Sequence, residues 1–152
     1  MKKVFVSGCF DILHAGHIQF FEDAKALGDH LTVCFASDAV LKLAKKRTPS
    51  IPEDNKAVIL KSLRCVDEVV MSSNLDPVFD FVDHIKRIKP DIVAITEDDT
   101  HVEEKKRYFE KYGVKLVVLP KLNYHTRTST SNIIADIKKN TTQGDSINIE
   151  KI

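Results

Sequence analysis

The chain has 152 residues, of which 43% are hydrophobic and 30% charged, and its formal net charge is +1. This length fits one domain with a full-sized core, and the near-neutral charge gives no reason to expect nucleic acid or an acidic membrane as a partner. The apolar runs are far shorter than a membrane span, and no signal-peptide pattern follows Met1, so we expect no membrane insertion. The three cysteines, Cys9, Cys34 and Cys65, lack metal-type spacing. We therefore expect reduced thiols in a cytoplasmic protein.

Strand and helix patterns alternate along the chain. Short apolar runs, typical of parallel strands covered on both faces, occupy residues 4–7, 31–36, 66–71, 91–95 and 114–119. Apolar residues at helical spacing predict helices over residues 16–27, 38–45, 53–63, 76–88, 102–112 and 129–138. This alternation predicts an α/β fold, namely a Rossmann-like, doubly wound parallel sheet of about five strands in a single domain. We place that domain at residues 1–139 and a polar C-terminal tail at residues 140–152.

The first predicted strand leads into Gly8-Cys9-Phe10-Asp11 and then into His14-Ala15-Gly16-His17, where a helix is predicted to begin. Such a junction is the usual phosphate site of an open α/β sheet, because N–H groups at a helix start lack partners and carry positive potential. Neutral imidazoles there are able to donate hydrogen bonds to phosphate oxygens. The two alternatives are a metal site, which needs further ligands, and a purely structural histidine pair. The glycines favour a ligand that approaches the backbone closely.

Two residues of this segment have ordinary structural interpretations as well. Cys9 is either a nucleophile or a packing residue at the strand end, and the absence of a cationic activator beyond the histidines favours packing. Asp11 either assists a ligand through water or caps the turn.

These ten residues, in this strand–turn–helix context, resemble the signature of the nucleotidyltransferase superfamily that includes the cytidylyltransferases and pantetheine-phosphate adenylyltransferase. The resemblance covers residues 3–139. It implies that His14 and His17 are catalytic and contact a nucleoside triphosphate, with His17 nearest the α-phosphate. It also implies a role for Asp11 toward the acceptor and a nucleotide site that includes Gly8, Cys9, Phe10 and Gly16.

A second segment, Thr128-Ser129-Thr130-Ser131, opens the last predicted helix and resembles the second signature of that superfamily. Hydroxyls and free N–H groups at a helix start are able to hold the β- and γ-phosphates, although a simple N-cap is the alternative. Arg127, just ahead, adds a charge-assisted contact to the predicted nucleotide site.

Two cations complete the predicted site. Arg64 begins a stretch similar to the Arg-x-Val-Asp-Glu-Val of glycerol-3-phosphate and choline-phosphate cytidylyltransferases, which implies that it faces the reacting phosphates; the alternative is a surface charge. The same resemblance implies that a lysine of the basic loop over residues 45–52 reaches the phosphates during transfer. We choose Lys46, with Lys45 in reserve, and the alternative is a solvated helix end. Lys46 and Arg64 are also predicted to contact the acceptor.

Three departures from the relatives indicate an acceptor different from the best-studied ones. Residues 95–100 keep Asp98, which we predict to contact the nucleotide, and Asp99, but lack the usual glycine and aromatic residue. Asn55-Lys56 stands where relatives usually carry an arginine, and residues 122–126 lengthen the loop before the last helix.

The predicted reaction is in-line attack of an acceptor phosphate oxygen on the α-phosphorus of a nucleoside triphosphate, with release of pyrophosphate. Mg²⁺ is expected to bridge the phosphates with few protein ligands. The favoured version transfers CMP from CTP to a small polyol, amino-alcohol or sugar phosphate, such as a glycerol-3-phosphate-like compound. The alternatives are an ATP-dependent adenylyltransferase acting on a heptose-type sugar phosphate or on FMN, and a nucleotide-binding module without turnover. The resemblance also implies a homodimer.

Overall fold

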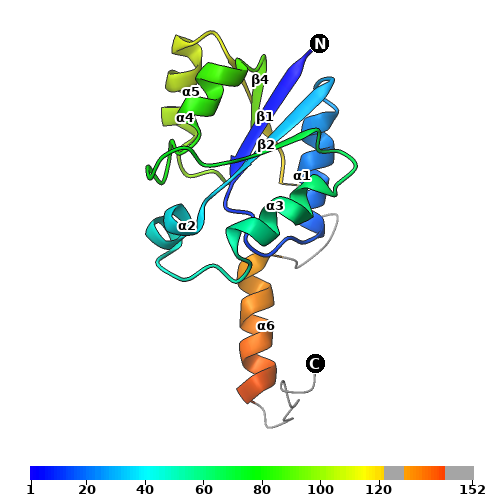
Figure 1. The fold of residues 1–152 in the computed structure, drawn as a ribbon, viewed down its shortest axis with the longest axis vertical. Coiled ribbons are helices and arrows are strands. Elements are labelled where there is room, and N and C mark those ends of the chain that lie inside the picture. The colour runs from blue at the N-terminus through cyan, green and yellow to red at the C-terminus, as the bar shows by residue number, and fades with distance from the viewer. Residues whose placement is uncertain (122–128, 143–152) are drawn as a thin grey trace.

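The computed structural model describes residues 1–121 and 129–142 (Figure 1). Its strands are β1 (Lys3–Gly8), β2 (His30–Phe35), β3 (Glu68–Met71), β4 (Ile92–Thr96) and β5 (Lys115–Leu119). They pair in parallel in the order β3-β2-β1-β4-β5. The helices are α1 (Ala15–Lys25), α2 (Asp38–Lys45), α3 (Glu53–Lys61), α4 (Val82–Ile88), α5 (Val102–Lys111) and α6 (Thr130–Thr142). The Rossmann-like α/β fold with a five-stranded parallel sheet is thus confirmed.

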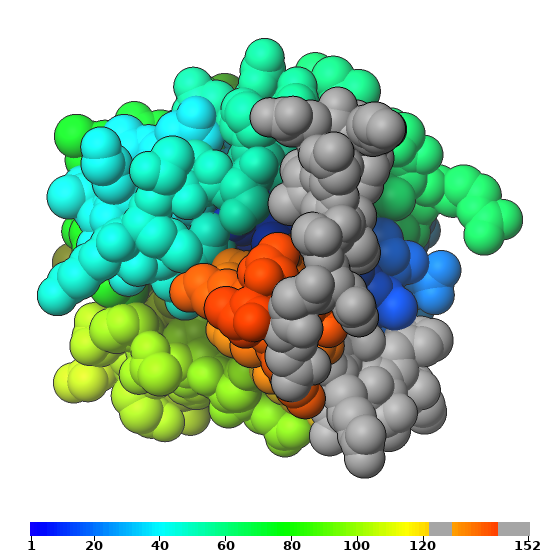
Figure 2. All heavy atoms as spheres, turned by 90° about the horizontal axis from the view of Figure 1, so that it is seen from below, coloured from blue at the N-terminus to red at the C-terminus, as the bar shows by residue number. Residues whose placement is uncertain are grey.

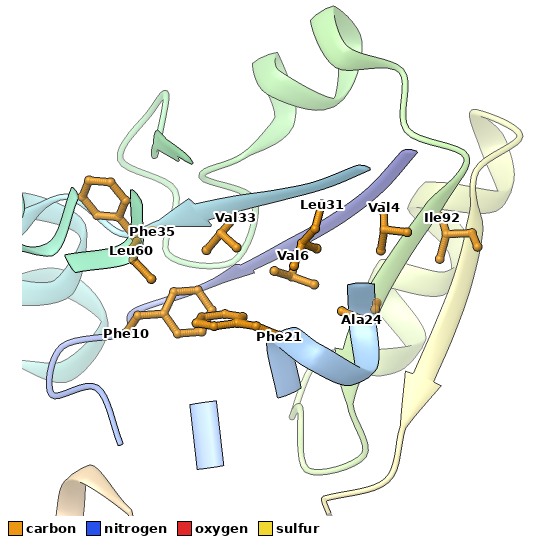
Figure 3. Packing of buried hydrophobic residues seen from close by; sticks show 11 residues of the cluster. Val4, Val6, Phe10, Phe21, Ala24, Leu31, Val33, Phe35, Leu60 and Ile92 are labelled. Carbon is orange, nitrogen blue, oxygen red and sulfur yellow. The ribbon is translucent and has the colours of Figure 1, made fainter. Parts of the chain in front are cut away.

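The alternation of side chains along the strands divides the core between the two faces of the sheet. Val4 and Val6 of β1 pack on one face with Phe21 of α1 and with α3, as Figure 3 shows. Phe5, which lies between them in β1, packs on the other face in a cluster that includes Phe109 of α5 and residues of α4. Both faces are therefore covered, which explains why the strands read as continuous apolar runs.

The sheet order places the candidate site. The chain adds β2 and β3 on one side of β1 and then returns to add β4 and β5 on the other side. The carboxyl ends of β1 and β4 consequently flank the point where the strand order reverses, and open α/β sheets bind ligands there. The start of α6 reaches this edge, because the Thr130 hydroxyl donates to the Ile12 carbonyl at 3.2 Å. From below, α6 emerges between the cyan atoms around α2 and the yellow-green atoms of the region after β4 (Figure 2).

Two element boundaries differ from the sequence prediction by four residues or more. Residues 77–81 form turns, and α4 begins only at Val82. The Asp76 carboxylate does accept hydrogen bonds from the backbone of Val78 and Phe79, at 2.8 and 2.9 Å, but it caps a turn and not the helix itself. At the other end of the chain, α6 extends to Thr142, beyond the predicted domain limit at residue 139. None of the helices described is long and apolar enough to cross a membrane.

The exit from β1 is tightly packed. Phe10 adopts a positive φ of 46°, and its buried ring meets Phe21 edge-on at 4.9 Å between centroids and His17 at 5.5 Å. The position of the ring depends on Gly8, because a Cβ at residue 8 would lie 2.7 Å from the Phe10 Cζ atom. Gly8 therefore leaves room for the Phe10 ring, and that ring packs against His17.

Lys56 of α3 joins the ends of two strands from inside the core. Its side chain is fully buried, and the ammonium donates to the carbonyls of Cys9 and Ala36 at 3.2 and 3.0 Å. These residues directly follow β1 and β2, so one cation holds the two strand exits together. Burial lowers the pKa of Lys56, while carboxylates such as Asp11 act in the opposite direction.

We predict that Gly8→Ala destabilises the fold by about 1–3 kcal/mol, because the added methyl group must displace the Phe10 ring from a packed core. Urea unfolding of the single variant and of Gly8→Ala in a Phe10→Ala background measures this effect. Removing the ring should abolish most of the cost of the methyl group. An equal cost in both backgrounds would show that the clash with Phe10 is not the cause.

Candidate active site

A cavity of about 370 Å³ lies at the carboxyl edge of the sheet. Several segments that are distant in the sequence line it, namely the exits of β1, β4 and β5, the α2–α3 connection, α1 and the start of α6. The predicted site residues that line the cavity are Gly8, Cys9, Phe10, Asp11, His14, Gly16, His17, Asp98, Ser129, Thr130 and Ser131. The structure therefore brings the two sequence signatures to one site.

The two histidines cap the start of α1 with the same ring nitrogen. The Gly16 amide donates to His14 Nδ1 at 3.1 Å, and the His14 amide donates to His17 Nδ1 at 3.3 Å. The rings lie against each other, with 3.9 Å between their centroids. Because each Nδ1 accepts a hydrogen bond from an N–H group, each neutral ring carries its proton on Nε2. Both rings are therefore able to present an Nε2–H donor to a ligand.

The surroundings of this pair favour the neutral state. Burial, and then the positive potential of His14 and Lys121, lower the pKa of His17 to about 4. Burial and Lys121 also lower the pKa of His14. At neutral pH both rings are hydrogen-bond donors without net charge, at a helix start that attracts anions. An anionic ligand bound to them would favour their protonation and so gain a charge-assisted contact.

Asp11 connects this site to the basic loop after α2. Its buried carboxylate accepts hydrogen bonds from the backbone of Ser50 and Ile51, at 2.9 and 3.0 Å, and from the Arg47 guanidinium. Burial opposes ionisation of Asp11, but these hydrogen bonds outweigh it and lower its pKa. The carboxylate is thus already occupied, and Asp11 acts as an anchor that holds Arg47 in the wall of the cavity, which Lys45 also lines.

The opposite wall comes from the exits of β4 and β5. The Lys121 ammonium pairs with the Asp98 carboxylate at 2.6 Å, and the Lys121 amide donates to the Glu97 carboxylate at 3.0 Å. Asp99, which also lines the cavity, is held by Lys105 at 2.5 Å. Asp98 therefore lines the cavity, as the partner of a lysine that the sequence analysis did not select.

Of the other cations predicted from the sequence, one lies outside the cavity lining and one lies outside the described residues. Lys46 is exposed at the left-handed C-cap of α2 and is outside the cavity lining, whereas its neighbours Lys45 and Arg47 are part of it. Arg127, together with Thr128, lies outside the described residues.

Arg64 lies at the far edge of the sheet. Arg64 is exposed and precedes β3. Asp67, three residues further along the chain, forms an ion pair of 2.6 Å with Lys25, the last residue of α1. The amide of Asp67 also donates to the carbonyl of Leu31, at the amino end of β2. Because all strands are parallel, this edge is opposite to the cavity. Within one chain, Arg64 does not join the residues around His14.

Covalent and metal chemistry find little support in the residues present. Burial raises the pKa of Cys9, and nearby Lys45 and Lys56 only partly oppose this effect, so the thiol remains protonated at neutral pH. No group of three or more metal-binding side chains occurs within residues 1–121 and 129–142. The metal-site interpretation of His14 and His17 therefore lacks further ligands in this part of the chain.

Sequence reasoning missed Arg47 and Lys121 as cavity residues. A signal for Lys121 was available, because it stands two residues beyond a predicted strand and every strand exit reaches this edge of a parallel sheet. For Arg47, the choice among adjacent basic residues depends on where α2 ends, which a sequence pattern locates only to within a few residues.

We predict that neutral His14 and His17 both carry the proton on Nε2, and that His17 titrates well below the ordinary value of 6.5. Nitrogen-15 chemical shifts of the rings, followed against pH, measure both properties. Since the unfolded chain binds this proton below about pH 6.5 and the folded chain only below about pH 4, His17 also lowers stability as the pH falls through that range. A proton on Nδ1, or a midpoint at or above 6.5, would contradict the capping geometry.

The sequence is similar to those of known proteins along most of its length. Residues 5–136 match the family model described as cytidylyltransferase-like. The FAD synthase of Pyrococcus horikoshii is 42% identical over 138 residues, which cover 89% of this chain and 91% of that protein. The bifunctional protein HldE of Helicobacter pylori is 39% identical over 139 residues, covering 91% of this chain but 28% of that protein.

Among solved structures, the lipopolysaccharide core biosynthesis protein from Thermoplasma volcanium has a TM-score of 0.68 and 27% identity, over 82% of this chain and 98% of that one. The family model extends over most of the sequence and includes both signatures that meet in the cavity. The chain therefore belongs to the cytidylyltransferase-like family, within the nucleotidyltransferase superfamily.

Proposed function

We propose that this protein is an FAD synthase, which transfers AMP from ATP to the phosphate of FMN and releases pyrophosphate. The observation that carries the proposal is its similarity to FAD synthases along nearly the whole length of both chains. The site supports this chemistry, because a neutral histidine pair, three cavity-lining cations and the start of α6 surround one cavity. These groups suit a triphosphate and a second phosphorylated substrate.

This proposal replaces the CTP-dependent reaction favoured by the sequence analysis. That preference depended on Arg64 and the Val66-Asp67-Glu68-Val69 stretch. In the structure Arg64 lies at the sheet edge opposite to the cavity, so within one chain it offers no contact to a base or phosphate there. The similar FAD synthases instead support adenylyl transfer to FMN, one of the two ATP-dependent alternatives.

The proposed reaction needs alignment and charge stabilisation, and no enzyme nucleophile. A phosphate oxygen of FMN attacks the α-phosphorus of ATP, and the bond from that phosphorus to the pyrophosphate oxygen breaks with its electron pair leaving on pyrophosphate. We assign to His14 and His17 the donation of Nε2–H hydrogen bonds to the triphosphate, with His17 at the α-phosphate. Lys45 and Arg47 line the wall anchored by Asp11 and would neutralise a phosphate beside it.

Mg²⁺ enters this proposal with the triphosphate, as part of the substrate MgATP. No group of three or more metal-binding side chains occurs among the described residues, and an ion carried by the phosphates needs few protein ligands. The protein residues named above act on phosphate oxygens directly.

A second acceptor, the oligomeric state and the cellular location complete the proposal. Similarity to HldE supports a sugar phosphate as the second candidate acceptor. A homodimer is expected from the family resemblance, and α6 offers an apolar stripe for it, formed by the half-buried Ile133 and Ile134 and the exposed Ile137. The cytoplasmic location is likewise an expectation from the sequence.

We predict that FMN with ATP gives FAD and pyrophosphate, and that CTP, GTP and UTP give much less product. Chromatographic detection of the flavin dinucleotide, with pyrophosphate release measured in parallel, tests both substrates. Glycerol-3-phosphate and a heptose phosphate serve as competing acceptors. Faster turnover of any other pair would overturn the assignment, and nucleotide binding without pyrophosphate release would support a non-catalytic module.

We predict that His17→Asn lowers kcat about 100- to 1000-fold, the range for loss of one donor to a developing charge. The asparagine amide keeps an acceptor near the position of Nδ1, so the helix cap survives while the Nε2–H donor is lost. His30→Asn, at the amino end of β2, is the matched control and should keep wild-type activity. Wild-type turnover of the His17 variant would remove this residue from the reaction.

A further inference from the structure

Lys121 is a cavity-lining cation whose charge acts on both histidines of the pair. It follows β5 at the carboxyl edge of the sheet and lines the same cavity as His14 and His17. Its positive charge contributes to the lowered pKa of both rings, whereas the charges of Lys45 and Arg47 act on the pKa of Cys9. The cavity thus has two positively charged walls, and Lys121 supplies the charge on the histidine side.

The ion pair between Lys121 and Asp98 is weak enough for a ligand to replace Asp98 as the partner of the lysine. The Lys121 side chain is 57% exposed and that of Asp98 is 49% exposed, so their ion pair is screened by water and contributes little to stability. The Lys121 backbone is held separately, through the hydrogen bond from its amide to Glu97. The ammonium is therefore free to turn toward a ligand while its Cα position stays fixed.

The other cations of the cavity are less able to turn toward a ligand beside the histidines. Arg47 is committed to the buried carboxylate of Asp11, with which it forms an ion pair. Lys45 extends from the end of α2, on the wall near Cys9. Among the described residues that line the cavity, Lys121 is the lysine whose charge both histidines sense.

We propose that Lys121 is a catalytic residue, which leaves Asp98 when a triphosphate binds and contacts the phosphate oxygens beside His14 and His17. This inference rests on the proposed nucleotidyl transfer and adds a residue that neither signature includes. As the acceptor oxygen bonds to the α-phosphorus and the bond to pyrophosphate breaks, negative charge increases on the leaving pyrophosphate. The ammonium stabilises that charge without gaining or losing a proton. Asp98 is released at the same time for polar contacts with the nucleotide.

The test compares Lys121→Met, which removes the charge at similar length, with Lys121→Arg, which keeps it. Lys115→Met is the matched control, because Lys115 is exposed at the opposite end of the same strand. We expect Lys121→Met to weaken binding of inorganic pyrophosphate about 10-fold or more by calorimetry and to lower kcat about 100-fold. Lys121→Arg should restore most of both losses, and Lys115→Met should change neither.

A second readout is independent of the substrate assignment. Loss of the Lys121 charge should raise the pKa of His14 and of His17, which ring titration by NMR measures without any nucleotide. Pyrophosphate affinity and ring pKa values that both match the wild type in Lys121→Met would overturn the inference. If the protein makes no FAD but both properties change as expected, the phosphate role of Lys121 stands and only the proposed acceptor or nucleotide fails.

Discussion

Two backbone N–H groups at the start of α1 determine the chemistry of the cavity. The amides of Gly16 and His14 donate to Nδ1 of His14 and of His17, so the free nitrogen of each ring is the one that carries the proton. Burial keeps the rings neutral, and the helix start adds positive potential without a formal charge. A site of this kind binds phosphate oxygens through donors that are oriented before the ligand arrives, which is the arrangement that electrostatic catalysis requires.

The rest of the domain keeps these donors in place. Phe10 packs edge-on against His17, and this packing is possible because residue 8 has no side chain. Lys56 ties the exits of β1 and β2 together from within the core, and Asp11 fixes the basic loop against the same turn. These buried polar groups are satisfied by named partners, so each is a structural support and not a free reactive group.

The sequence was sufficient for the fold because Val4, Phe5 and Val6 supply both faces of the sheet from one run. It also located the histidines, whose motif and strand–helix junction are local features. It was insufficient wherever a contact joins distant segments. Arg64 stands just before a predicted strand of a parallel sheet, which already indicates the edge opposite to the cavity, but the family resemblance pointed the other way. Nothing near Asp11 in the sequence reveals its bond to Arg47. The start of α4 was misplaced because Asp76 caps a turn with the same hydrogen bonds that a helix cap would make.

A crystal structure of the protein with a non-hydrolysable ATP analogue would test the central claim most directly. We predict that Nε2 of His14 and of His17 donates to triphosphate oxygens, with the α-phosphate beside His17 and with Nδ1 still accepting from the start of α1. A triphosphate bound elsewhere, or rings rotated so that Nδ1 faces the phosphates, would contradict it.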